Sequence, residues 1–423
     1  MANFVLKGNI CYSENLNKIR IIPQAYLVCI EGESAGVFRA VPECYAALPV
    51  EDFGESIIIP GITDLHVHAP QFAFRGLGMD MELLDWLESH TFPEESKYAD
   101  LGYAKRAYKQ FVNHMRRSAT TRAAVFATIH APATMLLMDR LEESGLVSYV
   151  GKVNMDRNSP DILCEKSAQA SLADTEQWIN DTKTRYKNTR PIITPRFIPS
   201  CSDELMHGLA ALAEKYQVPV QSHLSENLGE IQWVKALCPK AKFYGQAYEN
   251  FGMFGGKSPC IMAHCVYSGD EEVELMKKNG VFVAHSPMSN SNLSSGVAPV
   301  TKYLEAGLNV GLASDVAGGC TENMFRVMAD AIRASKLRWR LQDQAVKPLT
   351  IDQIFYIATL GGGRFFGKVG SFEPGYALDA VVLDDRSLDH PQRLDVRARL
   401  ERCIYLADDR QISAKYVAGN RLF

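Results

Sequence analysis

Two kinds of hydrophobic pattern alternate through the middle of the chain. Short apolar segments rich in β-branched residues are separated by longer segments in which apolar residues recur at helical spacing. Residues 203–217 and 271–280 are examples of the helical pattern, and the second ends on a glycine, which suits a helix stop. The eight short segments, which we predict to be buried strands, span residues 61–69, 123–129, 148–156, 191–197, 218–226, 260–265, 280–287 and 309–315. Eight strands alternating with helices predict an α/β fold of the (β/α)8, TIM-barrel type.

The two ends of the chain have a different pattern. Short apolar runs such as FVLKGNICYS near the start and ISAKYVAGNRLF at the end lie next to turn residues and have no helical period. No low-complexity tract or polar linker separates these ends from the middle. We therefore predict a small β-sandwich domain built from residues 1–59 and 371–423, and a barrel over residues 60–370.

Composition narrows the class of ligand. The chain has 423 residues, of which 47% are hydrophobic, so it can bury a large core. Lys and Arg total 45 against 49 for Asp and Glu, and this balance gives no electrostatic reason to expect nucleic acid or an anionic membrane as partner. We expect a small-molecule ligand.

Cysteine usage and the chain start indicate the compartment. None of the ten cysteines forms a CxxC pair, and no compact disulfide framework is apparent. The first residues lack the basic and apolar regions of a secretory signal, and no run of about 18 apolar residues predicts a membrane span. A cytoplasmic location is the simplest expectation.

Five of the ten histidines fall at the carboxyl ends of predicted strands, namely His66, His68, His223, His264 and His285, and Asp315 closes the eighth strand. A single histidine is more often a hydrogen-bonded structural residue than a ligand. In a barrel, however, the carboxyl ends of all strands meet on one rim, where active sites are built. Residues i and i+2 of a strand point to the same face, so the first two histidines both point into the barrel.

This arrangement predicts a metal site. Neutral imidazole is a good ligand for Zn²⁺, and His66, His68, His223 and Asp315 form a set of three nitrogens and one carboxylate. Such a set without thiolate suits Zn²⁺ or Fe²⁺. Cys265 follows a strand-end histidine; it is interpreted mainly as a small buried residue, with ligation as the alternative.

Glu226 lies three residues after His223 and has two interpretations. It can be a carboxylate at a helix start, stabilised by the helix dipole. Beside a water that a metal activates, it can instead be the group that moves protons. His264 and Asp315 could orient or deprotonate the same water, whereas His285 is as well explained by a structural role.

The motifs TDLHVH, MAHC, AHSPMSN and GLASD, in that order and with a histidine ending strand five, resemble the amidohydrolase superfamily over most of the chain. The segment PIITPRF lacks the lysine that dinuclear members carry at the end of strand four, which implies a mononuclear, deaminase-type member. Finer motifs, among them HAPQF, WLESHTFPEE, TPRFIPSCSDELM and SDVAGG, resemble the guanine-deaminating branch of that superfamily.

The resemblance implies hydrolysis of guanine to xanthine and ammonia by a homodimer that holds one Zn²⁺ or Fe²⁺ per chain. It implies that Glu226 is the proton shuttle and that His264 is a partner of the metal-bound water. It also implies that the purine is held by Gln71, Arg196 and Phe197 beside His223 and Glu226.

Two other hypotheses stay open at this point. A sibling aminohydrolase acting on another aminated purine or on a triazine would carry different residues at Gln71 and Arg196. A non-catalytic binding protein that keeps the barrel would have lost a ligand or Glu226, and the sequence retains the whole set.

Overall fold

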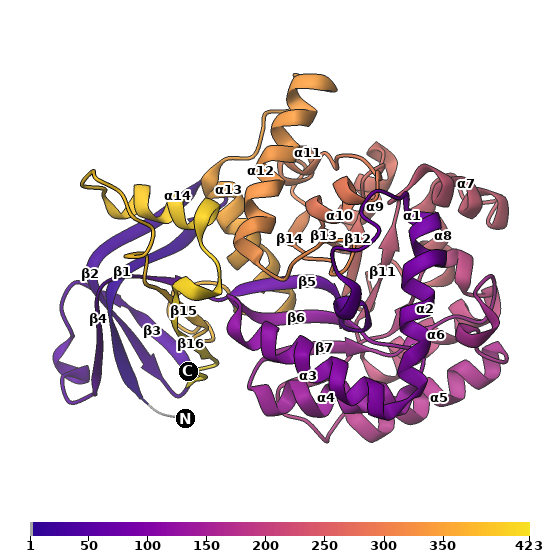
Figure 1. The fold of residues 1–423 in the computed structure, drawn as a ribbon, viewed down its shortest axis with the longest axis horizontal. Coiled ribbons are helices and arrows are strands. Elements are labelled where there is room, and N and C mark those ends of the chain that lie inside the picture. Colours follow the sequence, from indigo (N-terminus) through magenta and orange to yellow (C-terminus); the bar gives the residue numbers. More distant parts are fainter. Residues whose placement is uncertain (1–2) are drawn as a thin grey trace.

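Parallel strands surrounded by helices form the larger part of the molecule in the computed structural model, which describes residues 3–423 (Figure 1). All residues of the first two strands of this part are buried, as expected for parallel strands covered on both faces. The strands are β5 (Ile62–His68), β6 (Thr120–Phe126), β7 (Val147–Gly151), β8 (Val153–Asn154), β9 (Thr189–Pro191), β10 (Thr194–Pro195), β11 (Val220–Leu224), β12 (Cys260–His264), β13 (Phe282–His285) and β14 (Asn309–Leu312). Each of the eight predicted strand segments overlaps at least one of them.

Hydrogen bonds divide most of these strands between two four-stranded parallel sheets, β5-β6-β7-β9 and β11-β12-β13-β14, while β8 and β10 pair separately. Backbone contacts join the two larger sheets at both ends. Ile193 forms a parallel bridge with Val220 on one side. On the other side, the Asp315 N–H donates to the carbonyl of His66 at 2.9 Å. The predicted α/β fold class is confirmed, and these links connect the first strand to the last as a barrel requires.

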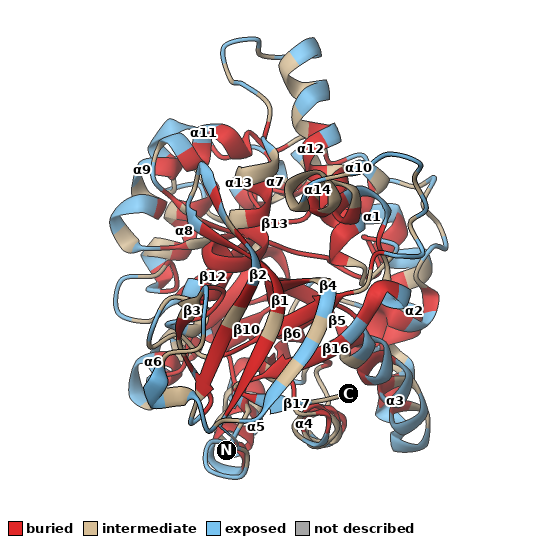
Figure 2. Cartoon of the chain, turned by 90° about the vertical axis from the view of Figure 1, so that its left-hand side faces the viewer, coloured by how far each residue is buried: buried red, intermediate tan, exposed pale blue. Residues whose placement is uncertain are grey.

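A small apolar cluster lies among the strands and supports this arrangement. Its buried members come from strands of both sheets and from the residues that directly follow them, and most have small side chains: Leu65, Ala124, Ile192, Ile261, Ala263, Ala284 and Ala313. Inward-pointing side chains from successive strands fill the interior of such a barrel, so it is a packed core and not a pore. The burial pattern in Figure 2 agrees, because the strands are largely buried and exposed residues gather on the outer helices and loops.

The helices cover the outside of the strands (Figure 1). Their ends follow local capping rules: the Ser202 side chain accepts a hydrogen bond from Leu205 N at the start of α6, and Gly280, with a φ of 67°, ends α9. The helices are α1 (Leu83–Trp86), α2 (Phe92–Glu95), α3 (Leu101–Arg117), α4 (Ala131–Ser144), α5 (Ala168–Thr182), α6 (Asp203–Tyr216), α7 (Leu228–Leu237), α8 (Tyr244–Phe251), α9 (Asp270–Asn279), α10 (Pro287–Asn292), α11 (Val300–Glu305), α12 (Met324–Leu341), α13 (Ile351–Tyr356) and α14 (Val396–Leu406).

Strands from both ends of the chain lie together beside the barrel (Figure 1). They are β1 (Phe4–Asn15), β2 (Lys18–Ile30), β3 (Glu33–Phe38), β4 (Val50–Pro60), β15 (Ala380–Leu383), β16 (Ile412–Val417) and β17 (Asn420–Arg421). The predicted sandwich would contain two sheets, but hydrogen bonds join these strands into one seven-stranded sheet in the order β17-β16-β15-β4-β1-β2-β3. The reason is β4, which pairs in parallel with β1 and antiparallel with β15 and so connects the two ends of the chain. The division at residues 59/60 and 370/371 stays a prediction.

Within residues 3–423, none of the helices combines the length and the apolar character needed to cross a membrane.

Candidate metal and active site

His66 and His68, at the end of β5, are the centre of a buried cluster of ligand atoms. Their Nε2 atoms are 3.1 Å apart, and the His66 Nε2 lies 3.1 Å from Asp315 Oδ1. Asp315 lies three residues beyond the end of β14, and its backbone φ of 46° is in the left-handed region. The two histidines are 1% and 3% exposed. The i, i+2 spacing therefore places both imidazoles on one face, as predicted.

His223, at the end of β11, joins this cluster from across the barrel. Its Nε2 is 3.3 Å from the Nε2 of His68, and its Nδ1 donates to the carbonyl oxygen of Arg196 at 2.6 Å. Because a carbonyl only accepts, this hydrogen bond places the proton on Nδ1 and leaves a lone pair on Nε2. Burial lowers the pKa of both His68 and His223 well below the ordinary histidine value, which keeps both imidazoles neutral.

These donor atoms fit a metal ion. Imidazole nitrogens and a carboxylate oxygen converge within a buried space, where unpaired lone pairs are costly. Two groups of side chains have donor atoms within 4.8 Å of one another: His66, His68 and Asp315, and His66, His223 and His264. Together they contain the four predicted ligands, and a cation between them satisfies all the acceptors at once. The protein therefore carries a site that could bind a metal ion.

His264, at the end of β12, approaches the cluster from a third direction. Its Nε2 is 3.7 Å from Asp315 Oδ2 and 3.5 Å from Glu226 Oε2. Its Nδ1 is 2.9 Å from the side-chain oxygen of Asn290, which orients the ring. His264 thus lies between the aspartate of the cluster and the carboxyl of Glu226, where a small reactant would contact all three.

Glu226 lies two residues beyond β11, and its side chain is buried. The Ser295 hydroxyl donates to Glu226 Oε1 at 3.4 Å, while the other carboxyl oxygen points at His264. Burial raises the pKa of Glu226 well above its usual range, and the nearby carboxyls of Glu230 and Asp315 raise it further. This environment favours the neutral carboxyl over the carboxylate, and a carboxyl group beside a bound water can accept a proton and later release it.

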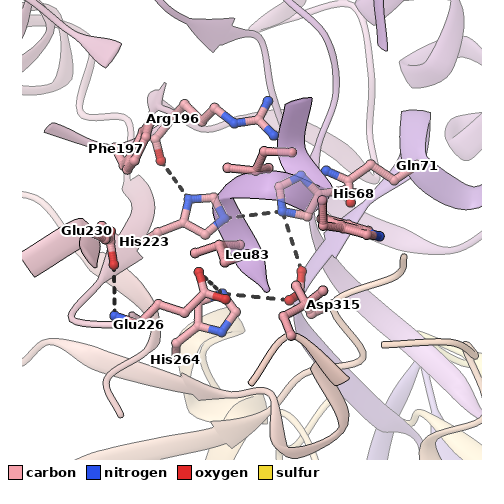
Figure 3. Close-up of a pocket in the computed structure, with 13 residues that line it drawn as sticks. His68, Gln71, Leu83, Arg196, Phe197, His223, Glu226, Glu230, His264 and Asp315 are labelled. Carbon is pink, nitrogen blue, oxygen red and sulfur yellow. Dashed lines mark hydrogen bonds and ion pairs between the residues drawn. The ribbon is translucent and has the colours of Figure 1, made fainter. Parts of the chain in front are cut away.

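A cavity opens next to this cluster. In Figure 3, Arg196 and Gln71 lie on one side of the pair His68–His223, and Glu226 and His264 lie on the other. Phe197 also lines the cavity, as does an apolar wall made of Leu83, Trp86, Leu87 and Leu293. The structure thus brings together every predicted ligand-binding and catalytic residue; His66 belongs to the metal cluster and is not among the residues that line the cavity.

Two residues whose roles were open lie apart from the cavity lining. His285 is 2% exposed at the end of β13, and burial together with nearby His264 lowers its pKa to about 3. Its Nδ1 has no hydrogen-bond partner among the described residues. The Cys265 thiol points to the carbonyl of Met262 at 3.6 Å and belongs to neither group of metal-ligating side chains found in residues 3–423. Both fit the structural interpretation.

Sequence reasoning missed several residues that support the site. Asp64 accepts hydrogen bonds from Ser314 Oγ at 2.5 Å and from Ser314 N at 3.0 Å, which ties the first strand to the last. Glu230 lines the cavity and accepts from Glu226 N at 3.0 Å. A local signal could have identified Glu230, because it completes a capping box with Asn227 at the start of α7. No such signal marks Asn290.

Comparisons with known proteins agree with this geometry. The model of the amidohydrolase family matches residues 57–422. A guanine deaminase of Dictyostelium discoideum is 36% identical over 446 aligned positions, which cover 99% of this chain and 98% of that protein. The crystal structure of a guanine deaminase from C. acetobutylicum with bound guanine in the active site is 48% identical, covers all of both chains and superposes with a TM-score of 0.97. A triazine hydrolase from Arthobacter aurescens shares only the fold, with 18% identity and a TM-score of 0.87. The chain therefore belongs to the amidohydrolase family and, within it, to the guanine deaminases.

Proposed function

We propose that this protein hydrolyses guanine to xanthine and ammonia with one divalent metal ion, Zn²⁺ or alternatively Fe²⁺, per chain. The observation that carries the proposal is one cavity lined by Arg196 and Gln71 on one side and by the buried Glu226, beside a metal-ligand cluster, on the other. The relatives named guanine deaminases, which match over nearly the whole chain, give the same assignment.

His66, His68, His223 and Asp315 are the residues that would hold the ion. When bound, such an ion is a Lewis acid that lowers the pKa of a water molecule to about 7. The hydrogen bond from His223 Nδ1 to the Arg196 carbonyl fixes the tautomer that a ligand needs. The absence of thiolate from the set favours Zn²⁺ or Fe²⁺ over softer ions.

Glu226 moves the protons of the reaction in this proposal. Water attacks C2 of guanine, and ammonia leaves only after the amino nitrogen has gained a proton. Glu226, as a carboxylate, takes a proton from the attacking water and then delivers it to the leaving nitrogen; the 3.5 Å contact of its Oε2 with His264 Nε2 supports this role. His264 and Asp315 orient the water during attack.

Arg196, Gln71 and Phe197 hold the purine in this proposal. A guanidinium donates two parallel hydrogen bonds to the acceptors of a planar heterocycle, which a lysine cannot do. The Gln71 amide offers a donor and an acceptor, which suits a base edge that presents both. Phe197 packs against the purine ring. His223 and Glu226 complete the contacts on the reacting side.

The test is ammonia release from purified protein of known metal content, offered guanine, adenine, cytosine and a triazine in parallel. We expect release from guanine alone, at about one metal ion per chain. If ammonia were released from another base and not from guanine, the protein would be the sibling aminohydrolase and the guanine assignment would be wrong. No release from any of the four by metal-loaded protein would contradict the enzymatic proposal altogether.

We further propose a homodimer in the cytoplasm. The resemblance to the family supports the dimer, as do the exposed leucines of α12 and α14, namely Leu337, Leu341 and Leu406. Ten free cysteines support a reducing compartment. Light scattering at several protein concentrations tests the dimer, and a constant monomer mass would contradict it.

A further inference from the structure

Glu95, the last residue of α2, lies directly behind the polar wall of the cavity. Its side chain is buried, and its two carboxylate oxygens have separate partners. Oε1 accepts from Gln71 Nε2 at 3.0 Å, and Oε2 accepts from Arg196 Nη1 at 2.6 Å. Gln71 and Arg196 line the cavity, whereas Glu95 does not. Glu95 therefore acts on a ligand only through these two side chains.

The contact with Glu95 fixes the orientation of the Gln71 amide. Gln71 Oε1 accepts from the backbone N–H of Ala317 at 3.2 Å, while Nε2 donates to Glu95. A flipped amide would place its NH₂ against a backbone donor and its oxygen against a carboxylate. One N–H and one lone pair of Gln71 stay available to a ligand.

The contact with Glu95 also balances the charge of Arg196. The two side chains are 4% and 5% exposed, so little solvent screens either charge. A guanidinium stays protonated in proteins, and removing its partner would leave an uncompensated buried cation. Paired as it is, Arg196 offers hydrogen-bond donors to the cavity without adding net positive charge. An anionic ligand would lose its hydration on entering and gain little attraction in return.

We propose that Glu95 is a positioning residue that makes this cavity select a neutral purine over an anionic one. The proposal rests on the proposed function. It adds a consequence for turnover, because xanthine is a stronger acid than guanine and its anion would be retained by an unpaired guanidinium. Glu95 thus favours release of the product as well as binding of the substrate.

The experiment compares two oxopurines by calorimetry with metal-loaded protein at neutral pH: hypoxanthine, which is neutral there, and urate, which is an anion. Glu95→Gln should lower the ratio of the Kd of urate to that of hypoxanthine by about tenfold, the scale of one charge-assisted interaction. Glu95→Asp keeps the charge and should leave that ratio close to wild type while weakening both ligands. Glu94→Gln is the matched control, because Glu94 is also buried but pairs with Lys97 at 2.6 Å.

A second variant has the opposite expected sign and does not depend on Glu95→Gln folding. Arg196→Met leaves Glu95 as the unpaired charge and should raise the urate-to-hypoxanthine ratio. An unchanged ratio in both variants, with only a lower melting temperature, would overturn the proposal and reduce Glu95 to a structural residue. Guanine turnover by the wild type is measured separately. If guanine is turned over but the Kd ratio of the variants is unchanged, only the inference about Glu95 is refuted. If guanine is not turned over but the Kd ratio shifts, only the proposed function is refuted.

Discussion

Replacing Glu226 by Gln tests the proton-transfer role with little change of shape. Glutamine is nearly isosteric with a protonated carboxyl, and its amide oxygen can still accept the hydrogen bond that Ser295 donates at 3.4 Å. It can neither take a proton from water nor deliver one to the leaving nitrogen. The side chain is absent from both groups of metal-ligating residues, so the metal content should not change.

The expected loss of rate follows from the two proton transfers that we propose for Glu226. General acid–base catalysis contributes about 10²- to 10⁴-fold. Because one residue serves both the attack and the departure of ammonia, we place the loss in kcat at the upper end, about 10⁴-fold. At about 1.36 kcal/mol per factor of ten, the barrier rises by about 5.4 kcal/mol. The KM for guanine should change much less, since Gln71 and Arg196, the proposed contacts of the base, are unchanged.

The same variant has a predicted effect on stability in the metal-free protein. Burial raises the pKa of Glu226 well above its usual range, so the folded state binds a proton that the unfolded state releases. The free energy of unfolding of the wild type therefore falls as pH rises from about 4.3, the usual glutamate pKa, through the higher pKa of the folded state. Gln does not ionise, so the free energy of unfolding of the variant lacks this pH-dependent loss. The variant should therefore be more stable than the wild type at neutral pH, and the difference in free energy of unfolding should shrink towards about pH 4.

The assay is steady-state ammonia release with metal analysis, together with denaturant unfolding of the metal-free proteins at several pH values. Glu272→Gln is the matched control, because Glu272 is also buried, and burial raises its pKa too, yet it does not line the cavity. It should change stability and leave kcat near wild type. If Glu226→Gln kept more than about a tenth of the wild-type kcat, below the smallest acid–base contribution, the assignment of the shuttle would be refuted. Loss of the metal would mean that Glu226 is a ligand.

Three further outcomes are expected elsewhere in the molecule. Dialysis against a chelator should abolish activity and lower the melting temperature, because an ion at 1,000 times its Kd contributes about 4 kcal/mol; full activity in protein shown to be metal-free would contradict the site. Lys415→Met should cost about 1–3 kcal/mol in urea unfolding, because the buried Lys415 Nζ is a hydrogen-bond donor to three carbonyls at the end of α3 and the variant removes it. The exposed Lys277 on α9 is the control, and Lys277→Met should cost nothing. Gly362→Ala should cost about 1–3 kcal/mol in the same assay, since the added Cβ would lie 2.2 Å from Thr63 Oγ1, and a neutral result would show that the contact relaxes freely.

The strands and the convergent histidines were predictable because both depend on local pattern. A short apolar run identifies a strand, and the position of His223 or His264 at its end fixes the rim on which it lies. The partners of each strand are not local information. The pattern therefore predicted that both ends of the chain share one β domain, but it did not identify β4 as the strand that joins them into one sheet.

The supporting residues were unpredictable for a related reason. Glu95 reaches Arg196 across 101 positions of sequence, and Asn290 reaches His264 across 26. Such contacts depend on how loops and short helices pack at the carboxyl ends of the strands, and this packing cannot be predicted from residue spacing. A glutamate in a short polar segment looks like many exposed glutamates until its burial is known.

The backbone hydrogen bond from Asp315 to His66 has a consequence for how the protein matures. Two predicted ligands of the ion belong to the first and last strands of the barrel, and Asp64 and Ser314 beside them also bond, across 250 positions of sequence. The complete ligand set therefore exists only after the final strand has docked against the first. Binding of the proposed metal ion therefore depends on completed folding of the barrel, and a polypeptide that ends before residue 315 lacks one of the four predicted ligands.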